Sequence, residues 1–270
     1  MSRLPRVSTV SVLGILAVLV ALASAQAQDL TAYDRWSEIK PMYFGSETIV
    51  SGEDVLEIVA PERALDSAMV PVRLNSLLGR GDPRRIRSIH LIVEGNPVPL
   101  AGRFAFPAAH VVSLETQVRV ASYSYVRAVA ELSDGQLVRA STFVKAAGGC
   151  SAPPMERSAT TDNRLGHLDL TRQPAQDGNT TTIELQIHHP NYSGLQYDQI
   201  MRIYIPAHYV TGIDLEYAGT PLVRAQTDIS MSRNPLLRIT HRGTPTGAVT
   251  ASVVDSKDNE FSARWEAGGG

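Results

Sequence analysis

Hydrophobic positions along most of the chain come in short runs in which apolar and polar residues alternate. Within one run, Val118, Val120 and Ser122 share one face of an extended chain while Arg119 and Ala121 share the other. This two-residue period is typical of half-buried β-strands. The runs predicted as strands are 54–60, 68–74, 86–95, 116–122, 126–132 and 137–145, then 180–189, 200–206, 211–217, 235–241, 248–254 and 260–266. The pattern therefore predicts an all-β fold.

Two segments depart from this pattern. Residues 30–40 place apolar side chains at near-helical spacing and predict one short helix that caps the fold. Residues 146–163 have no periodicity and are rich in small residues and proline, which predicts a flexible linker. We therefore expect two immunoglobulin-like β-sandwich domains in tandem, at 28–145 and 164–270.

The first 27 residues have the order of a secretory signal peptide. Two arginines precede an apolar run, and small residues in A-x-A spacing follow it. The alternative is a transmembrane anchor, but the run is shorter than the ~20 residues that a spanning helix needs. We expect cleavage near Ala25 or Ala27, export to the periplasm, and no membrane insertion afterwards.

The composition limits which partners the protein can bind and which roles its cysteine can have. The net charge is -2 and no basic cluster is present, which argues against binding to nucleic acid. The chain has a single cysteine, Cys150, so it cannot form an internal disulfide. An unpaired thiol in an exported protein either pairs with another molecule or takes part in chemistry.

Cys150 lies in the linker, directly after Gly148 and Gly149. Four interpretations are open: a buried core thiol, a disulfide-linked dimer, a lipid anchor, and a thiol presented to other proteins on a mobile arm. The small and polar neighbours offer no apolar surroundings, and the residue is far from the signal peptide. Gly148 and Gly149 give the arm flexibility, so the sulfur could travel ~17 Å from the last strand. This favours the carrier arm over the dimer.

Several ordered motifs resemble one family. The stretches "IVSGEDVLEIVAPERALDSAMVPVRLN", "IRSIHLIVEGNPVPLAGRFAF" and "FVKAAGGC" are similar to the sulfur-compound carrier subunit SoxY, whose terminal arm is Gly-Gly-Cys-Gly-Gly. In the second half, "HHPNYSGLQYD", "IYIPAHYVTGIDLEYAG", "SRNPLLRITHRG" and "DSKDNEFSARW" resemble its partner SoxZ. Here Ser151 and Ala152 replace the glycines after the cysteine, and the arm is tethered on both sides.

The resemblance implies a fused SoxYZ-like carrier without catalytic activity or a cofactor. Cys150 would hold a sulfur intermediate covalently and present it to periplasmic redox enzymes, either a Sox-type cytochrome and hydrolase or a quinoprotein (PQQ) dehydrogenase system. His189 and Gly194 would shape a domain contact beside the arm. The alternative is a non-covalent docking module for a dehydrogenase or cytochrome, in which the cysteine is incidental.

The adjacent histidines His188 and His189 invite a metal site. Consecutive residues of a strand point to opposite faces, so both cannot easily reach one ion. No Cys-x-x-Cys or His-Glu-x-x-His motif is present, nor a Gly-x-Ser-x-Gly element of a hydrolase. The sequence therefore predicts no metal site and no active site.

Overall fold

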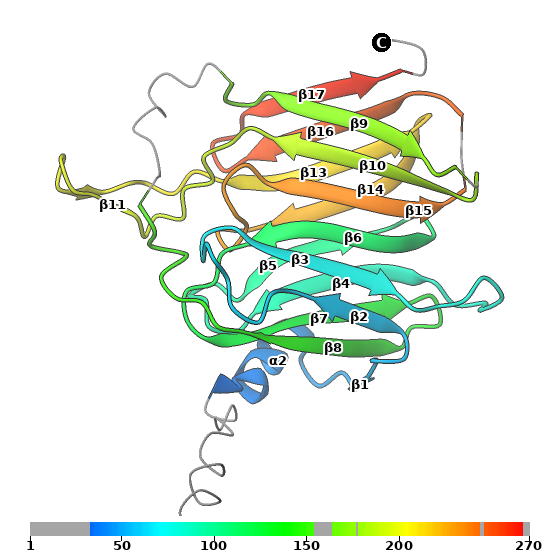
Figure 1. The fold of residues 1–270 in the computed structure, drawn as a ribbon, viewed down its shortest axis with the longest axis horizontal. Helices are drawn as coiled ribbons and strands as arrows, with labels where there is room; N and C mark the ends of the chain where they lie inside the picture. The colour runs from blue at the N-terminus through cyan, green and yellow to red at the C-terminus, as the bar shows by residue number, and fades with distance from the viewer. Residues whose placement is uncertain (1–32, 154–163, 177, 244–245, 267–270) are drawn as a thin grey trace, which may run out of the picture. The chain divides into compact units, whose positions relative to one another are not determined.

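The computed structural model describes residues 33–153, 164–176, 178–243 and 246–266 (Figure 1). The predicted signal peptide, the first residues of the predicted helix and residues 154–163 of the predicted linker lie outside the described residues. Within these ranges, no helix combines the length and the apolar character that crossing a membrane requires.

The described chain is almost entirely β-structure, which confirms the all-β prediction. The first half forms β1 (Ile49–Ser51), β2 (Leu56–Val59), β3 (Val70–Ser76), β4 (Ile86–Val93), β5 (Leu100–Ala105), β6 (Val111–Val118), β7 (Ser124–Leu132) and β8 (Leu137–Val144). The second half forms β9 (Leu168–Pro174), β10 (Thr180–Ile187), β11 (Tyr197–Asp198), β12 (Ile203–Tyr204), β13 (Val210–Tyr217), β14 (Thr220–Thr227), β15 (Leu236–Arg242), β16 (Val249–Asp255) and β17 (Glu260–Trp265).

Apart from β11 and β12, which pair with each other, the strands form two layers, and both layers continue from one half of the chain into the other (Figure 1). The larger sheet has the order β1-β8-β7-β4-β5-β14-β13-β16-β17, and the smaller has the order β2-β3-β6-β15-β10-β9. The halves meet through antiparallel pairing of β5 with β14 and of β6 with β15. Two immunoglobulin-like halves therefore lie edge to edge, and each covers a strand edge of the other.

The sequence pattern missed β1, β5, β9, β11 and β14. β5 contains a glycine in its interior, and β14 begins with Thr-Pro, so neither has clear alternation. In the structure, Gly102, Arg103, Phe104 and Ala105 of β5 face Thr227, Gln226, Ala225 and Arg224 of β14. Backbone hydrogen bonds of this kind leave no pattern in the sequence. The join between the halves was consequently absent from the prediction.

One hydrophobic core runs between the two sheets and includes residues of both halves. β10 illustrates its origin, because Ile183, Leu185 and Ile187 point inward and are buried while the residues between them are half-buried. Burying such a side chain stabilises the fold by about 1.5–3 kcal/mol. The shared core makes the two halves one packing unit.

The helix α2 (Trp36–Phe44) begins and ends later than the predicted helix. Pro41 lies inside it, so packing rather than intrinsic propensity holds this helix. Ile39 and Phe44 are buried against Ile92 of β4 and Val129 of β7. The helix therefore covers the outer face of the larger sheet.

His90 of β4 lies beneath α2 and gives the fold a pH dependence. Its ring contacts that of Phe44 at a centroid distance of 5.1 Å, and its Nδ1 has no partner among the described residues. Burial, together with the charge of Arg103, lowers the pKa of His90 to about 4. The unfolded chain therefore takes up a proton near pH 6.5 that the folded chain does not take up until near pH 4.

We expect the free energy of unfolding to fall as the pH is lowered from 7 to 5, and His90 to account for about 1–2 kcal/mol of this fall after allowance for its partial exposure. His90→Phe should remove this contribution from the pH dependence, as measured by urea unfolding at both pH values. His110→Phe, at an exposed histidine, is the matched control. An unchanged slope in His90→Phe would contradict the assignment.

Candidate functional site: a docked cysteine arm

The arm, residues 146–151, lies against the body of the protein. The backbone N–H groups of Gly148 and Gly149 donate to the carbonyl oxygens of Ala121 and Val120 at 2.8 and 2.9 Å. A side-chain Cβ at Gly149 would lie 2.0 Å from the carbonyl oxygen of Ser67, so only glycine permits this close approach. Gly148 has a φ of +80°, which favours glycine in the turn. Both glycines thus serve docking in this structure.

Cys150 is buried, with a relative exposure of 2%. The expectation of an exposed thiol without a place to pack is therefore wrong for this docked state. Burial raises the pKa of the Cys150 thiol from 9.0 to about 11, and the nearby charge of Arg119 offsets only part of this rise. A thiol in this state is a poor nucleophile, since the thiolate is the reactive form.

Arg119 lies beneath the arm and is 1% exposed. Its Nη1 donates to the carbonyl oxygen of Gly149 at 3.1 Å, and its Nη2 donates to that of Asn191 at 3.0 Å. Burial lowers the pKa of Arg119. This guanidinium therefore links the arm to a loop of the second half.

The 189–196 loop forms the other wall of the site. Ser193 donates its hydroxyl to the carbonyl oxygen of Cys150 at 2.5 Å. Gly194 follows with a φ of +82°, beside Ala207. The predicted neighbours His189 and Gly194 thus lie in the loop that contacts the arm, on either side of Asn191 and Ser193.

Asparagines that precede prolines position the segments around the arm. Asn96 is buried, accepts a hydrogen bond from the N–H of Ala121 at 2.8 Å and donates to the carbonyl oxygen of Arg119 at 2.7 Å. In the second half, the Oδ1 of Asn234 accepts a hydrogen bond from the N–H of His189 at 3.1 Å. The repetition of Asn-Pro in the two halves is the sequence signal that could have pointed to this role.

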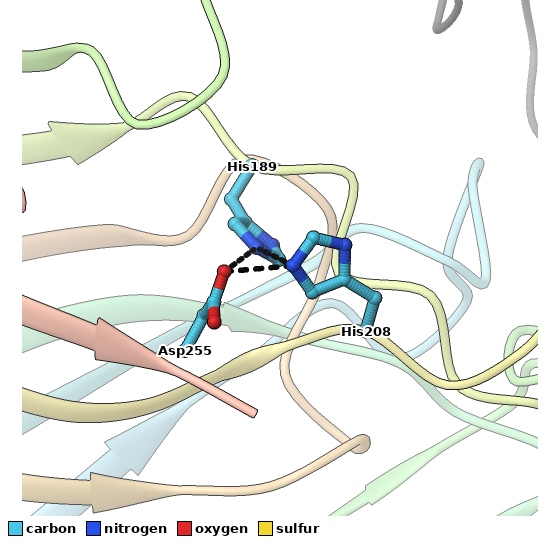
Figure 2. A group of neighbouring side chains, drawn as sticks. All are labelled: His189, His208 and Asp255. Carbon is cyan, nitrogen blue, oxygen red and sulfur yellow. Dashed lines mark hydrogen bonds and ion pairs between the residues drawn. The ribbon is translucent and has the colours of Figure 1, made fainter. Parts of the chain in front are cut away.

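His188 and His189 do point to different partners, as strand geometry predicted. The Nε2 of His188 lies 2.6 Å from Asp169 near the surface, whereas that of His189 lies 3.4 Å from Asp255 in the interior. His189, His208 and Asp255 form a buried cluster whose side chains converge (Figure 2). Such a set of two imidazoles and one carboxylate is able to hold a metal ion.

Burial is the main reason that the pKa of His189 falls to about 4, with the neighbouring His208 adding to it. For Asp255, burial alone raises the pKa of the carboxyl. Hydrogen bonds from Asn259, His208 and the N–H of Lys257 outweigh this effect of burial, and the pKa of Asp255 lies below its usual range. The cluster therefore holds a neutral imidazole at His189 and a carboxylate at Asp255 near neutral pH.

Two family models match the chain in tandem. Sulfur oxidation protein SoxY matches residues 40–150, and sulphur oxidation protein SoxZ matches residues 170–266. The chain belongs to the fused SoxYZ-like proteins. The resemblance found in the sequence is thereby confirmed, and with it membership of a sulfur-oxidation carrier family.

Solved structures with a similar fold include the sulfur carrier protein SoxY from Chlorobium limicola f thiosulfatophilum. The two sequences are 24% identical over a match that covers 40% of this chain and 89% of the SoxY chain, with a TM-score of 0.34. A superoxide reductase (neelaredoxin) from Ignicoccus hospitalis is 23% identical, covers 34% of this chain and 79% of its own, and has a TM-score of 0.29. At these TM-scores the similarities carry no further argument. Among curated proteins, none matches the chain.

In this SoxYZ-like protein the docked arm lies where the two family regions meet. Arg119 and Cys150 belong to the SoxY region, and Cys150 is its last matched residue. Asn191 and Ser193 belong to the SoxZ region. Arg119, Asn96, Asn191 and Ser193 are the site residues that sequence analysis missed, because their partners are remote along the chain.

Proposed function

We propose that this SoxYZ-like protein is a periplasmic carrier that binds a sulfur-containing intermediate covalently on Cys150 and presents it to partner enzymes. The observation that carries the proposal is the position of the only cysteine, at the end of the SoxY region, on an arm held to the body by a few contacts. Loading and unloading follow thiol–disulfide exchange. The thiolate attacks a sulfur of an S–S bond, a new S–S bond forms, and the departing sulfur leaves as a thiolate that takes up a proton.

The carrier cycle requires an undocked arm. The buried thiol, with its pKa near 11, has to leave its place before it reacts. The docked arm is then the resting state, and a partner enzyme captures the released form. Sox-type cytochromes and hydrolases or a quinoprotein dehydrogenase system are the partners we propose.

The test is the intact mass of the exported protein, measured without and then with reductant. We expect a discrete added mass on the peptide that contains Cys150, removed by reductant. The size of the added mass would give the molecular mass of the bound group. A doubling of the mass that reductant reverses would indicate instead the disulfide-linked dimer, which also needs an undocked Cys150.

A second candidate is a docking module in which Cys150 is incidental. The hairpin of β11 and β12 favours it, because it carries a concentration of exposed apolar side chains, as protein-binding surfaces do. These are Leu195, Tyr197, Ile200, Met201, Ile203 and Tyr204. An unmodified thiol, combined with unchanged function after loss of the cysteine, would favour this candidate over the carrier.

A further inference from the structure

The buried cluster of His189, His208 and Asp255 brings three potential ligand atoms together. The two Nε2 atoms lie 3.3 Å apart, and the Oδ2 of Asp255 lies 2.7 Å from that of His208 and 3.4 Å from that of His189. His189 follows β10, His208 precedes β13, and Asp255 ends β16, and their side chains point toward a common centre (Figure 2).

The three atoms leave one contact weak in any arrangement of protons. If both Nε2 atoms carry a proton, both donate to the Asp255 carboxylate, and the contact from His189, at 3.4 Å, is long for a hydrogen bond. If the Nε2 of His189 is unprotonated, its lone pair faces the same carboxylate oxygen. A cation at the centre would instead engage a lone pair of each of the three atoms.

The spacing also suits a metal ion. Ligands at ~2.0–2.2 Å from a tetrahedral zinc ion lie ~3.3–3.5 Å from one another. Two of the three separations, 3.3 and 3.4 Å, match this edge, and the third opens from 2.7 Å with a small rotation of the carboxylate. We propose that His189, His208 and Asp255 form a binding site for a divalent transition-metal ion of the zinc class, with a fourth position open.

Groups behind the ligands hold them in a binding geometry. The Nδ1 of His189 accepts a hydrogen bond from the backbone N–H of Asn191 at 3.0 Å and lies 3.1 Å from the Oδ1 of the same residue. When Nε2 binds a metal, Nδ1 would carry the proton and donate it to this Oδ1. The Oδ1 of Asp255 accepts hydrogen bonds from the N–H groups of Lys257 and Asn259. The side chains of His189 and Asp255 are fully buried, while that of His208 is 10% exposed. Entry of the ion is therefore on the His208 side.

The other histidine cluster, His167 and His188 around Asp169, differs in a decisive way. There the guanidinium of Arg164 lies 3.2 Å from the Asp169 carboxylate and 2.7 Å from the Nε2 of His188. A cation already occupies the place that a metal would take. His188→Ala is therefore a matched control for loss of a histidine next to the proposed site.

Metal at the site would tie three segments of the SoxZ region together. The 189–196 loop would be fixed to β13 and β16, and this loop contacts the arm through Ser193 and, by way of Asn191, through Arg119. The site lies behind the surface on which the arm docks. It is independent of whether Cys150 carries a cargo.

The experiment is metal binding by the full exported chain in a Cys150→Ser background, which removes the thiol as a competing ligand. We expect one equivalent of Zn²⁺ after dialysis and a rise in Tm of about 5–10 °C at a Zn²⁺ concentration 100 times the Kd. His208→Ala should lose the bound ion and the rise in Tm, and His188→Ala should keep both. Co²⁺ should give the absorption of a four-coordinate nitrogen and oxygen site.

Zinc binding that survives His208→Ala, or is lost in His188→Ala, would overturn the proposal. Because His208→Ala could fail to fold, ring-nitrogen NMR of the wild-type residues provides a second readout. Among the seven histidines, only His189 and His208 should shift at Nε2 when Zn²⁺ is added. Unshifted Nε2 signals at saturating Zn²⁺ would leave the cluster as a hydrogen-bonded triad and overturn the site.

Discussion

Replacing Cys150 with serine should abolish the covalent adduct and reduce the carrier-dependent turnover of the partner system to background. A serine hydroxyl is far less acidic than a thiol and cannot form a disulfide, so neither loading nor exchange is available. The measurement is substrate turnover or growth that depends on the proposed pathway, together with the intact mass of the variant. No other single change should have so large an effect on function with so little effect on the fold.

Ser151→Ala is the matched control for this variant. It lies next to the thiol, is exposed, and loses only the hydroxyl contact to the carbonyl oxygen of Gly148 at 3.3 Å. It should keep both the adduct and the turnover. Unfolding of the Cys150→Ser protein at a denaturant concentration close to that of the wild type would exclude loss of structure as the cause. Full turnover in Cys150→Ser would contradict the carrier and leave the docking module.

Gly149→Ala should release the arm and make Cys150 reactive. The added Cβ would lie 2.0 Å from the carbonyl oxygen of Ser67 and 2.7 Å from that of Val120, and backbone atoms at these distances have to separate. Once exposed, the thiol returns from a pKa of about 11 toward 9.0. At pH 8 this raises the thiolate fraction about a hundredfold, and alkylation by iodoacetamide should accelerate by a similar factor.

Gly135→Ala is the control for Gly149→Ala. Gly135 has a φ of +87° and open space around it, in the turn between β7 and β8. This variant introduces backbone strain far from the thiol and should alkylate at the wild-type rate. If Gly149→Ala also alkylates at the wild-type rate, the close approach of Gly149 to Ser67 does not hold the arm.

The sequence predicted most strands correctly, because their side chains alternate between core and solvent. β10 and β16 are examples, and Ile183 and Val253 face the core as their spacing requires. β6 was displaced. The run predicted over 116–122 continues as a strand only to Val118, and residues 119–121 leave the strand to contact Asn96 and the arm. Polar contacts over long sequence distances override local alternation in such places.

The sequence failed to predict that the arm docks on the body of the protein, which is the larger difference. The absence of apolar neighbours around Cys150 in the sequence suggested an exposed thiol, yet its surroundings come from Arg119 and Ser193, which are distant along the chain. The glycines beside it favour flexibility in an isolated peptide. In the folded protein they permit close backbone contact, which only the opposing segments reveal.

By itself, the sequence determined the all-β class, the tandem SoxY-like and SoxZ-like order and the single thiol, because alternation, motif order and residue identity are properties of the chain. Only the tertiary structure decided that the two halves share both sheets, that Cys150 is buried, and that His189 meets His208 and Asp255. These features depend on contacts between strand edges and loops that are remote in sequence. Backbone pairing and loop packing at such distances leave no periodic signal in the chain.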